Sequence, residues 1–289
     1  MTDEPILDDP LVSTEWLAEH LEDPRLVLID ATWYMPPAPS DARADHAQAH
    51  IPGALFIDID EVSDHANPLP HMLAEPHDFA THVRRLGVEP DSLVVVYDTQ
   101  GLFSSPRVWW NFRVMGHDNV RVLDGGLGKW IAEGRPVEMG WPQKPHGEFK
   151  AHFDPSLVRT LDEVLTALTD GDAQLVDARS AARFTGEAPE PRPGLRSGHM
   201  PGARNLPSQS VVAADGRLKS AAELAALFAE AGVDLDRPII TTCGSGVSAA
   251  ILALALARLG RDGVPVYDGS WTEWGGRADT PVVTGPADV

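Results

Sequence analysis

The sequence predicts an α/β protein made of two tandem copies of one domain, each with a mainly parallel sheet flanked by helices. Two observations lead to this fold class: several motifs recur once in the same order, and short apolar runs alternate with amphipathic runs in both halves. The chain has 289 residues, about twice the length of a usual domain. Buried strands that alternate with helices are typical of parallel sheets covered on both faces.

The internal repeat is carried by short motifs. HIPGALFIDID begins at His50 and HMPGARNLPS begins at His199, while VLDGGLGKW at Val122 matches VYDGSWTEW at Val266. A Pro-rich stretch, PVEMGWPQKPHGEFKAHFDP, separates the copies and is typical of a linker. We therefore assign the first domain to residues 1–145, the linker to 146–157 and the second domain to 158–289. The matched pairs His50 and His199, Gly87 and Gly232, and Trp130 and Trp274 lie 149, 145 and 144 residues apart.

Each copy is expected to contain the same elements in the same order. A short strand, LVLID or QLVD, ends in Asp, and an H-x-P-G-A turn leads into a second strand. An amphipathic helix, residues 221–228 in the second copy, precedes Gly-Val, and an apolar strand follows that ends at Asp98 or Cys243. Ligand sites in such sheets lie beyond the carboxyl ends of strands. Cys243 falls at that edge.

Composition excludes several classes of partner. The formal net charge is −20 and the pI is about 4.8, which disfavours binding to nucleic acid or to an anionic membrane. The single cysteine cannot form an internal disulfide, and the acidic N-terminus lacks the pattern of a secretory signal. We expect a cytoplasmic protein with no membrane span.

Cys243 lies between an apolar strand and an apolar helix, in the run TTCGSGVSAAILALALARLG. Gly244, Ser245 and Gly246 predict a tight loop, and the helix is expected to begin around Val247. Amides of such a loop, together with the positive end of the helix, favour a thiolate over a thiol. A buried structural thiol is the alternative. Because the first copy has Asp98 at this place, we expect only the second copy to perform chemistry.

The cysteine loop, the paired H-x-P-G-A motifs and the DGG and DGS turns together resemble the tandem-domain rhodanese superfamily of sulfurtransferases. The loop CGSGVSA is most similar to that of 3-mercaptopyruvate sulfurtransferases, with Ser248 where the family usually has Thr. The resemblance implies two rhodanese-like domains, the first inactive and the second catalytic. It implies that sulfur moves from 3-mercaptopyruvate through a persulfide on Cys243 to a thiol acceptor, such as thioredoxin or a small thiol, or to cyanide, with release of pyruvate. No cofactor and no metal are expected.

The resemblance also implies a set of site residues. The catalytic group is Cys243, Ser245, Asp60 and His71, in which Asp60 is lent by the first domain. The donor carboxylate is expected on Arg183 and Arg192, because planar guanidinium groups suit carboxylates. The cysteine loop supplies the rest of the substrate-binding set: Gly244, Gly246, Val247 and Ser248.

Simpler roles stand beside these. Asp60 has the sequence position of a cap for a helix starting near Glu61. His71 is alternatively an ordinary loop histidine. The two arginines are alternatively solvated surface charges. His50 and His199 occur in both copies, which favours a shared role in turn structure.

Other functions share parts of the pattern. Thiosulfate is the nearest alternative donor, although the related enzymes that use it carry basic residues after the cysteine, and Gly244 and Ser245 are not basic. A persulfide carrier without turnover is the non-enzymatic alternative. The loop also matches G-x-G-x-x-A, but too few residues follow for a dinucleotide-binding domain. A cysteine phosphatase is disfavoured because Ser248 and Ala249 replace the Arg that clamps phosphate.

Overall fold

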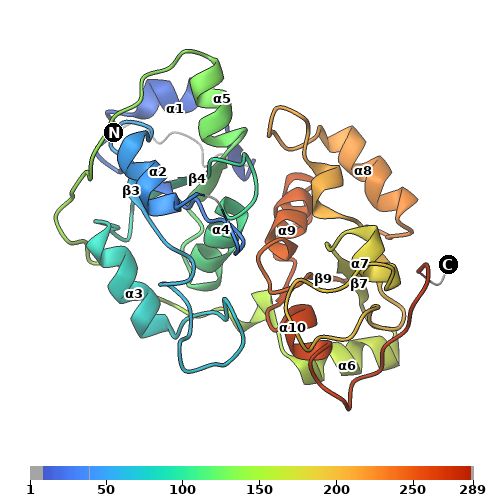
Figure 1. Cartoon of the computed structure of the whole chain (residues 1–289). Coiled ribbons are helices and arrows are strands. Elements are labelled where there is room, and N and C mark those ends of the chain that lie inside the picture. Colours follow the sequence, from blue (N-terminus) through green and yellow to red (C-terminus); the bar gives the residue numbers. More distant parts are fainter. Residues whose placement is uncertain (1–8, 39, 288–289) are drawn as a thin grey trace. The chain divides into compact units, whose positions relative to one another are not determined.

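The computed structural model describes residues 9–38 and 40–287 and contains two compact units, each with its own five-stranded parallel sheet (Figure 1). Unit 1 takes in the described residues up to Val62, then Glu75–Phe153 and Ala214–Arg217. Unit 2 takes in Ser63–Ala74, Asp154–Ala213 and the described residues from Leu218 onward. Residues 1–8, part of the acidic N-terminus considered above, lie outside the described residues.

Unit 1 has a sheet with the strand order β1-β5-β4-β2-β3, all parallel, so that β4 is central. Its strands are β1 (Leu11–Val12), β2 (Leu26–Asp30), β3 (Leu55–Phe56), β4 (Leu93–Tyr97) and β5 (Val120–Leu123). Its helices are α1 (Thr14–His20), α2 (Ala42–Gln48), α3 (Pro76–Arg85), α4 (Ser105–Val114) and α5 (Gly126–Ala132).

The sheet of unit 1 is buried on both faces. Alternate side chains of β2 and β4, among them Leu28 and Val95, form one core cluster with residues of α1 and α5 such as Leu17 and Trp130. The intervening residues, such as Val96, point to the other face, where α4 packs on β4 and β5. This is why the strands are continuously apolar instead of alternating with polar residues.

Unit 2 repeats this topology with the order β6-β10-β9-β7-β8, so that β9 is central. Its strands are β6 (Val158–Arg159), β7 (Gln174–Asp177), β8 (Arg204–Asn205), β9 (Ile239–Thr242) and β10 (Val266–Tyr267). Its helices are α6 (Leu161–Asp170), α7 (Ala181–Thr185), α8 (Ala221–Glu230), α9 (Ala249–Arg258) and α10 (Ser270–Trp274), with 3₁₀ turns η1 (Pro155–Leu157) and η2 (Ser208–Val211).

The core of unit 2 is built in the same way. Leu175 and Ile240 from the sheet pack with Val164 of α6 and with Trp271 and Trp274 of α10. Helix α9, apolar and buried from Ala249 to Leu256, packs on β9 and β10. The α/β fold class with two parallel-sheet domains is therefore confirmed.

Two local expectations about helices are wrong. Helix α9 begins at Ala249, two residues after the expected start, because Gly246 has a left-handed φ of 78° and Ser248 is the N-cap. No helix begins near Glu61, since the residues around it form a turn in which the Val62 N–H bonds to the Asp58 carbonyl. Asp60 is therefore not a helix cap.

The two repeated histidines hold turns, as expected. The ring of His50 is bonded to the carbonyl of His46 and to Glu138, and the ring of His199 is bonded to the carbonyl of Phe184.

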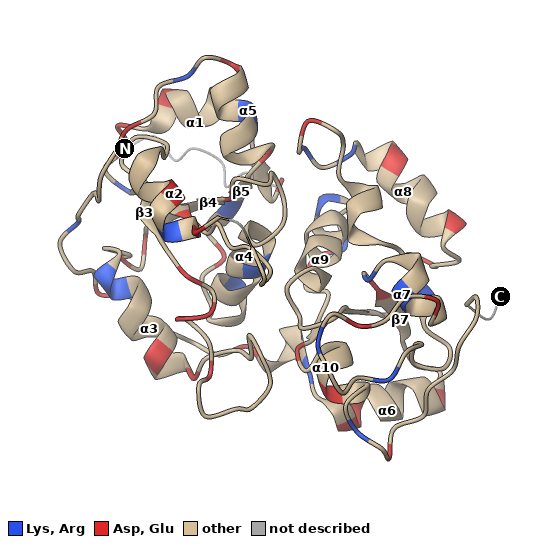
Figure 2. Cartoon of the chain, viewed as in Figure 1, with Lys and Arg blue, Asp and Glu red and all other residues tan. Residues whose placement is uncertain are grey.

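Charged residues are distributed over the helices and loops of both units (Figure 2), and the whole sequence has 43 acidic residues against 23 basic ones. Within residues 9–38 and 40–287, no helix combines the length and the apolar character needed to cross a bilayer.

Burial of His117 in unit 1 predicts a pH dependence of stability. Desolvation lowers the pKa of this histidine below its usual 6.5, and its Nε2 lies 3.0 Å from the carbonyl oxygen of Ser92. The neutral ring is favoured in the folded state, so its contribution is complete above about pH 6.5 and is lost as the pH falls through the lower pKa of the folded state. His117→Gln keeps an N–H donor but does not titrate. Urea denaturation at about pH 7 and about pH 5 should show a smaller loss of stability in this variant than in the wild type, and equal losses would contradict the assignment.

Candidate active site at the carboxyl edge of the second sheet

Cys243 directly follows the central strand of unit 2. It is 1% exposed and begins a loop of five residues, 244–248, that leads into α9. The loop contains Gly244, Gly246, Val247 and Ser248, the four loop positions predicted to contact substrate, and Ser245, which is 6% exposed. No described residue is hydrogen-bonded to the Ser245 hydroxyl in this ligand-free structure. The cysteine therefore lies at the edge of the sheet where ligand sites of parallel α/β folds occur.

The equivalent loop of unit 1 surrounds the carboxylate of Asp98 with backbone amides. Asp98 follows the central strand β4, is fully buried, and begins a loop of six residues, 99–104, one residue longer than its counterpart. Its Oδ2 accepts hydrogen bonds from the amides of Phe103, Ser104 and Ser105 and from the Ser105 hydroxyl, at 2.7 to 3.1 Å. Its Oδ1 accepts the amide of Gln100 at 2.9 Å. A strand-to-helix loop of this design thus encloses an anion with backbone N–H groups.

The two glycines of the cysteine loop have different reasons to be glycine. Gly246 has a φ of 78°, a conformation that side chains other than glycine rarely adopt. Gly244 does not have a positive φ, so its backbone conformation does not require glycine. A Cβ at Gly244 would instead lie 3.1 Å from a terminal nitrogen of Arg183. The missing side chain leaves room for the guanidinium against the loop.

Arg183, on the short helix α7, is held beside the loop by Glu190. The Glu190 carboxylate, 1% exposed, accepts from Nε and from a terminal nitrogen of Arg183 at 2.5 to 3.3 Å. Figure 2 colours the basic part of α7 blue. The Arg183 side chain is 21% exposed, so the guanidinium is fixed on one side and open on the other.

Glu190 also binds a second, fully buried guanidinium, that of Arg179. Arg179 donates to Glu190 and to both carboxylate oxygens of Asp177, and it stacks 4.1 Å from the ring of Trp271. Burial alone would lower the pKa of Arg179, but the charges of Asp177 and Glu190 outweigh burial and raise it. The two negative charges of Asp177 and Glu190 thus balance the two positive charges of Arg179 and Arg183. Sequence reasoning missed Arg179, two residues after the end of β7, and Glu190, in the Pro-rich run EAPEPRPG, since a charged residue at either place gives no sign of burial.

His71 and Arg192 meet within unit 2. The segment Ser63–Ala74 packs with unit 2 although it lies in the first half of the sequence, and the Leu73 amide donates to Asp268 at 2.7 Å. Nη2 of Arg192 lies 3.2 Å from Nε2 of His71. His71 is 6% exposed and has a φ of 61°, an unusual conformation that is often found at functional sites. It is therefore more than an ordinary exposed loop residue.

Asp60 belongs to unit 1, unlike the other predicted site residues. Its Oδ2 accepts the indole N–H of Trp33 at 2.8 Å, and its side chain is exposed. The neighbouring carboxyl group of Asp58 accepts the Asp60 amide, and burial raises the pKa of Asp58 above its usual value.

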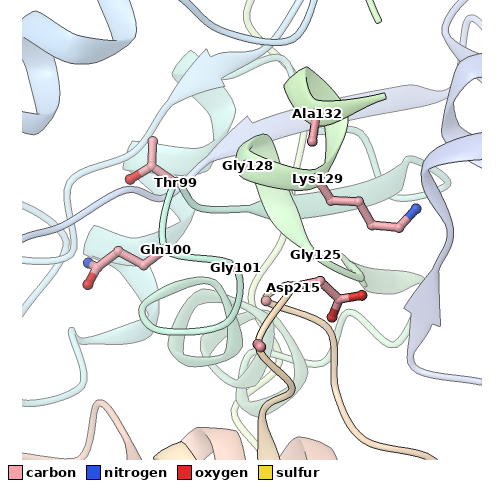
Figure 3. A pocket seen from close by; sticks show the side chains of 10 residues that line it. Thr99, Gln100, Gly101, Gly125, Gly128, Lys129, Ala132 and Asp215 are labelled. Atoms are coloured by element: carbon pink, nitrogen blue, oxygen red, sulfur yellow. The ribbon is translucent and has the colours of Figure 1, made fainter. Parts of the chain in front are cut away.

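A cavity of about 370 Å³ lies in unit 1, and no residue of the cysteine loop lines it (Figure 3). It is bordered by the loop after β4, the start of α5 and residues 214–216, and it contains no cysteine. Its only cation, Lys129, already binds the Thr14 hydroxyl and Glu133. The Lys129 hydrogen bond lowers the pKa of Glu133 to about 2. With its one positive charge neutralised, this cavity is not suited to an anionic donor.

The fold and the loop define an α/β protein with duplicated domains and one cysteine at a strand-to-helix loop. The rhodanese-like domain model matches residues 13–133 and 160–277, one match in each half. The chain belongs to the rhodanese family.

Individual relatives cover nearly the whole chain. The protein named 3-mercaptopyruvate sulfurtransferase from Escherichia coli K12 is 48% identical over 94% of this chain and 96% of its own length. The Arabidopsis thaliana protein named thiosulfate/3-mercaptopyruvate sulfurtransferase 1, mitochondrial, is 44% identical over 95% of this chain and 78% of its own length. The crystal structure of SseA from Escherichia coli, described as a 3-mercaptopyruvate sulfotransferase, superposes with a TM-score of 0.84 and 45% identity, covering 91% of this chain and 99% of that one.

The different roles of the two loop glycines predict different effects on stability. Gly246→Ala places a Cβ in a left-handed conformation and should reduce the free energy of unfolding by about 1 kcal/mol. Gly244→Ala has no such strain, and the flexible end of Arg183 can move by a few tenths of an ångström, so its urea midpoint should stay near that of the wild type. Equal losses in both variants would contradict these assignments.

Proposed function

We propose that this protein is a sulfurtransferase that takes sulfur from 3-mercaptopyruvate onto Cys243 as a persulfide, passes it to a thiol acceptor and releases pyruvate. The observation that carries the proposal is the position of Cys243 at the carboxyl end of β9 with the guanidinium of Arg183 against the same loop. The names of the relatives point to the same donor. A thiol and a cation at the same loop suit a donor that carries both sulfur and a carboxylate.

The donor carboxylate would bind Arg183 and Arg192. Glu190 fixes one edge of the Arg183 guanidinium, and the remaining N–H groups are open to a planar anion. Arg192 faces His71 through one terminal nitrogen and has further donors on the same group. These local guanidinium groups would attract the anionic donor, although a chain with a net charge of −20 repels anions overall.

The first chemical step is attack of the Cys243 thiolate on the mercapto sulfur. A sulfur–sulfur bond forms, the carbon–sulfur bond breaks, and its electron pair enters the three-carbon fragment as the enolate of pyruvate. The enolate then gains a proton. We assign delivery of this proton to Ser245, with Asp60 or His71 as the group that would supply it. The amides of Gly244, Val247 and Ser248 would surround the charged sulfur, as the unit 1 loop surrounds Asp98. The Gly246 amide is not part of this set, because it donates to the Ser270 hydroxyl.

In the second half of the cycle, an acceptor thiolate attacks the outer sulfur of the persulfide and Cys243 leaves as a thiolate. Thioredoxin or a small thiol serves as acceptor, and cyanide can replace it as the nucleophile. Because a thiol acceptor must stay reduced, we propose that the protein acts in the cytoplasm. The cycle involves no metal or organic cofactor, no nucleic acid and no membrane.

Thiosulfate is a second candidate donor, favoured by the double name of the Arabidopsis relative. Against it, no basic side chain follows Cys243 in the loop. One preparation should be assayed for pyruvate release from mercaptopyruvate and for thiocyanate formation from thiosulfate and cyanide. We expect a higher kcat/KM for mercaptopyruvate, and a clear preference for thiosulfate would overturn the donor assignment.

Replacing the nucleophile should separate chemistry from folding. Cys243→Ser keeps the shape of the side chain but cannot form a persulfide, so pyruvate release should fall to background while the thermal unfolding midpoint stays close to that of the wild type. Intact-mass measurement after mercaptopyruvate should show the mass of one added sulfur in the wild type only. Sulfur on the variant would exclude Cys243 as the carrier.

The two arginines should govern donor affinity. Removing one charge-assisted hydrogen-bonding group costs about 1.5–3 kcal/mol, so Arg183→Ala and Arg192→Ala should each lower kcat/KM for mercaptopyruvate by about ten- to a hundred-fold, mainly through KM. Arg237→Ala is the matched control, because Arg237 lies before the amino end of β9 and binds the Gly171 carbonyl. Unchanged kcat/KM in both site variants would remove the carboxylate clamp from the mechanism.

A further inference from the structure

Ser270, the first residue of α10, has a conformation that a serine rarely adopts. It is fully buried and has a φ of 49°. Left-handed backbone is unfavourable for a residue with a side chain, and it persists where the surroundings impose it, often at functional sites. The sequence motif DGSW gave no reason to single this serine out.

Unit 1 uses glycine at the same place. In the matched motif DGGL the residue is Gly126, with a φ of 57°, and a Cβ there would lie 2.2 Å from the carbonyl oxygen of Asp98. Both copies therefore keep the left-handed turn next to the loop of the central strand. Only the copy with the cysteine carries a side chain at that turn, although glycine would adopt the turn without strain. The hydroxyl of Ser270 must do something that glycine cannot.

That hydroxyl binds the cysteine loop at two points. Oγ of Ser270 accepts the backbone N–H of Cys243 at 3.2 Å and that of Gly246 at 3.1 Å, and it donates to the carbonyl oxygen of Tyr267 at 2.8 Å. The Thr242 hydroxyl lies 3.3 Å from the same oxygen and is a third, longer donor contact. The one donor and two acceptor sites of the Ser270 hydroxyl are therefore all used. The hydroxyl thus ties Cys243 and Gly246 to the end of β10.

The next two residues of α10 hold the carbonyl groups of the same loop. The Trp271 amide donates to the Cys243 carbonyl at 2.9 Å, and the amide and hydroxyl of Thr272 donate to the Gly244 carbonyl at 2.9 and 2.6 Å. In a planar trans peptide the N–H points away from the C=O. The N–H groups of Gly244 and Ser245 therefore point away from α10, and no acceptor among the described residues is bonded to either.

We propose that Ser270 is a positioning residue for Cys243: its hydroxyl holds the loop so that the amides of Gly244 and Ser245 stay free to stabilise charge on the transferred sulfur. The inference rests on the proposed sulfurtransferase function. Ser270 touches neither donor nor acceptor in this account. It acts by accepting the Cys243 and Gly246 amides, which leaves the Gly244 and Ser245 amides available to the sulfur.

Two substitutions separate the hydroxyl from the backbone strain. Ser270→Ala removes the hydroxyl and keeps the strained turn, whereas Ser270→Gly removes the hydroxyl and restores the residue found in unit 1. Ser220→Ala is the matched control, since Ser220 caps α8 through Glu223 and its loss weakens unit 2 without contact to the loop. Persulfide formation is followed in single turnovers with mercaptopyruvate by intact mass, together with steady-state kcat and KM and the thermal unfolding midpoint.

We expect both Ser270 variants to form persulfide at least about tenfold more slowly, with kcat reduced and KM near the wild-type value, because the arginines are untouched. Ser270→Gly should unfold at a higher temperature than Ser270→Ala and still be slow. Ser220→Ala should be less stable but as fast as the wild type. A Ser270→Gly rate equal to the wild-type rate, or equal slowing in Ser220→Ala, would overturn the inference. Absence of sulfur on the wild type would instead refute the proposed function.

Discussion

The candidate site depends on the hydrogen bonds between α10 and the loop after β9. Three consecutive residues, Ser270 to Thr272, supply a hydroxyl oxygen and two backbone amides to the loop. Because each peptide group is rigid and planar, fixing the carbonyls of Cys243 and Gly244 also fixes the direction of the next two N–H groups. The direction of these dipoles is therefore set before any donor arrives, which is how preorganised sites avoid reorganisation during reaction.

The two units show one scaffold used in two ways. In unit 1 the loop closes on the carboxylate of Asp98, which accepts the amides of Phe103, Ser104 and Ser105. In unit 2 the same edge carries a cysteine, a shorter loop and a nearby guanidinium. Replacing an acceptor-only carboxylate with a nucleophilic sulfur frees amides that a reacting group can use. The duplicated fold thus provides an internal reference for the site.

Much of the fold follows from periodicity and repetition. The continuous apolar runs ending at Asp98 and Cys243 predicted the central strands of both sheets, since burial on both faces leaves no room for polar alternation. The start of α9 was misplaced because a left-handed Gly246 stops the helical pattern before Ala249, and sequence alone does not show φ. The segment Ser63–Ala74 packs with unit 2, which the order of the repeats could not predict.

The site was less accessible to sequence reasoning than the fold. Cys243 could be predicted as a site residue because Gly244 and Gly246 indicate a tight loop between a strand and a helix. Glu190 and Arg179 are not visible, because burial of a charged network depends on which carboxylates and guanidinium groups meet in space. Ser270 looks like an ordinary turn residue until its φ is compared with that of Gly126.

Amide NMR of the protein before and after loading with sulfur shows whether the Gly244 and Ser245 amides stabilise charge on the transferred sulfur. Persulfide formation with mercaptopyruvate should shift the backbone N–H resonances of Gly244 and Ser245, as expected for new hydrogen bonds to a charged sulfur. The resonances of Cys243 and Gly246 N–H, already bonded to the Ser270 hydroxyl, should change little by comparison. Unmoved Gly244 and Ser245 resonances on a fully loaded protein would contradict the account.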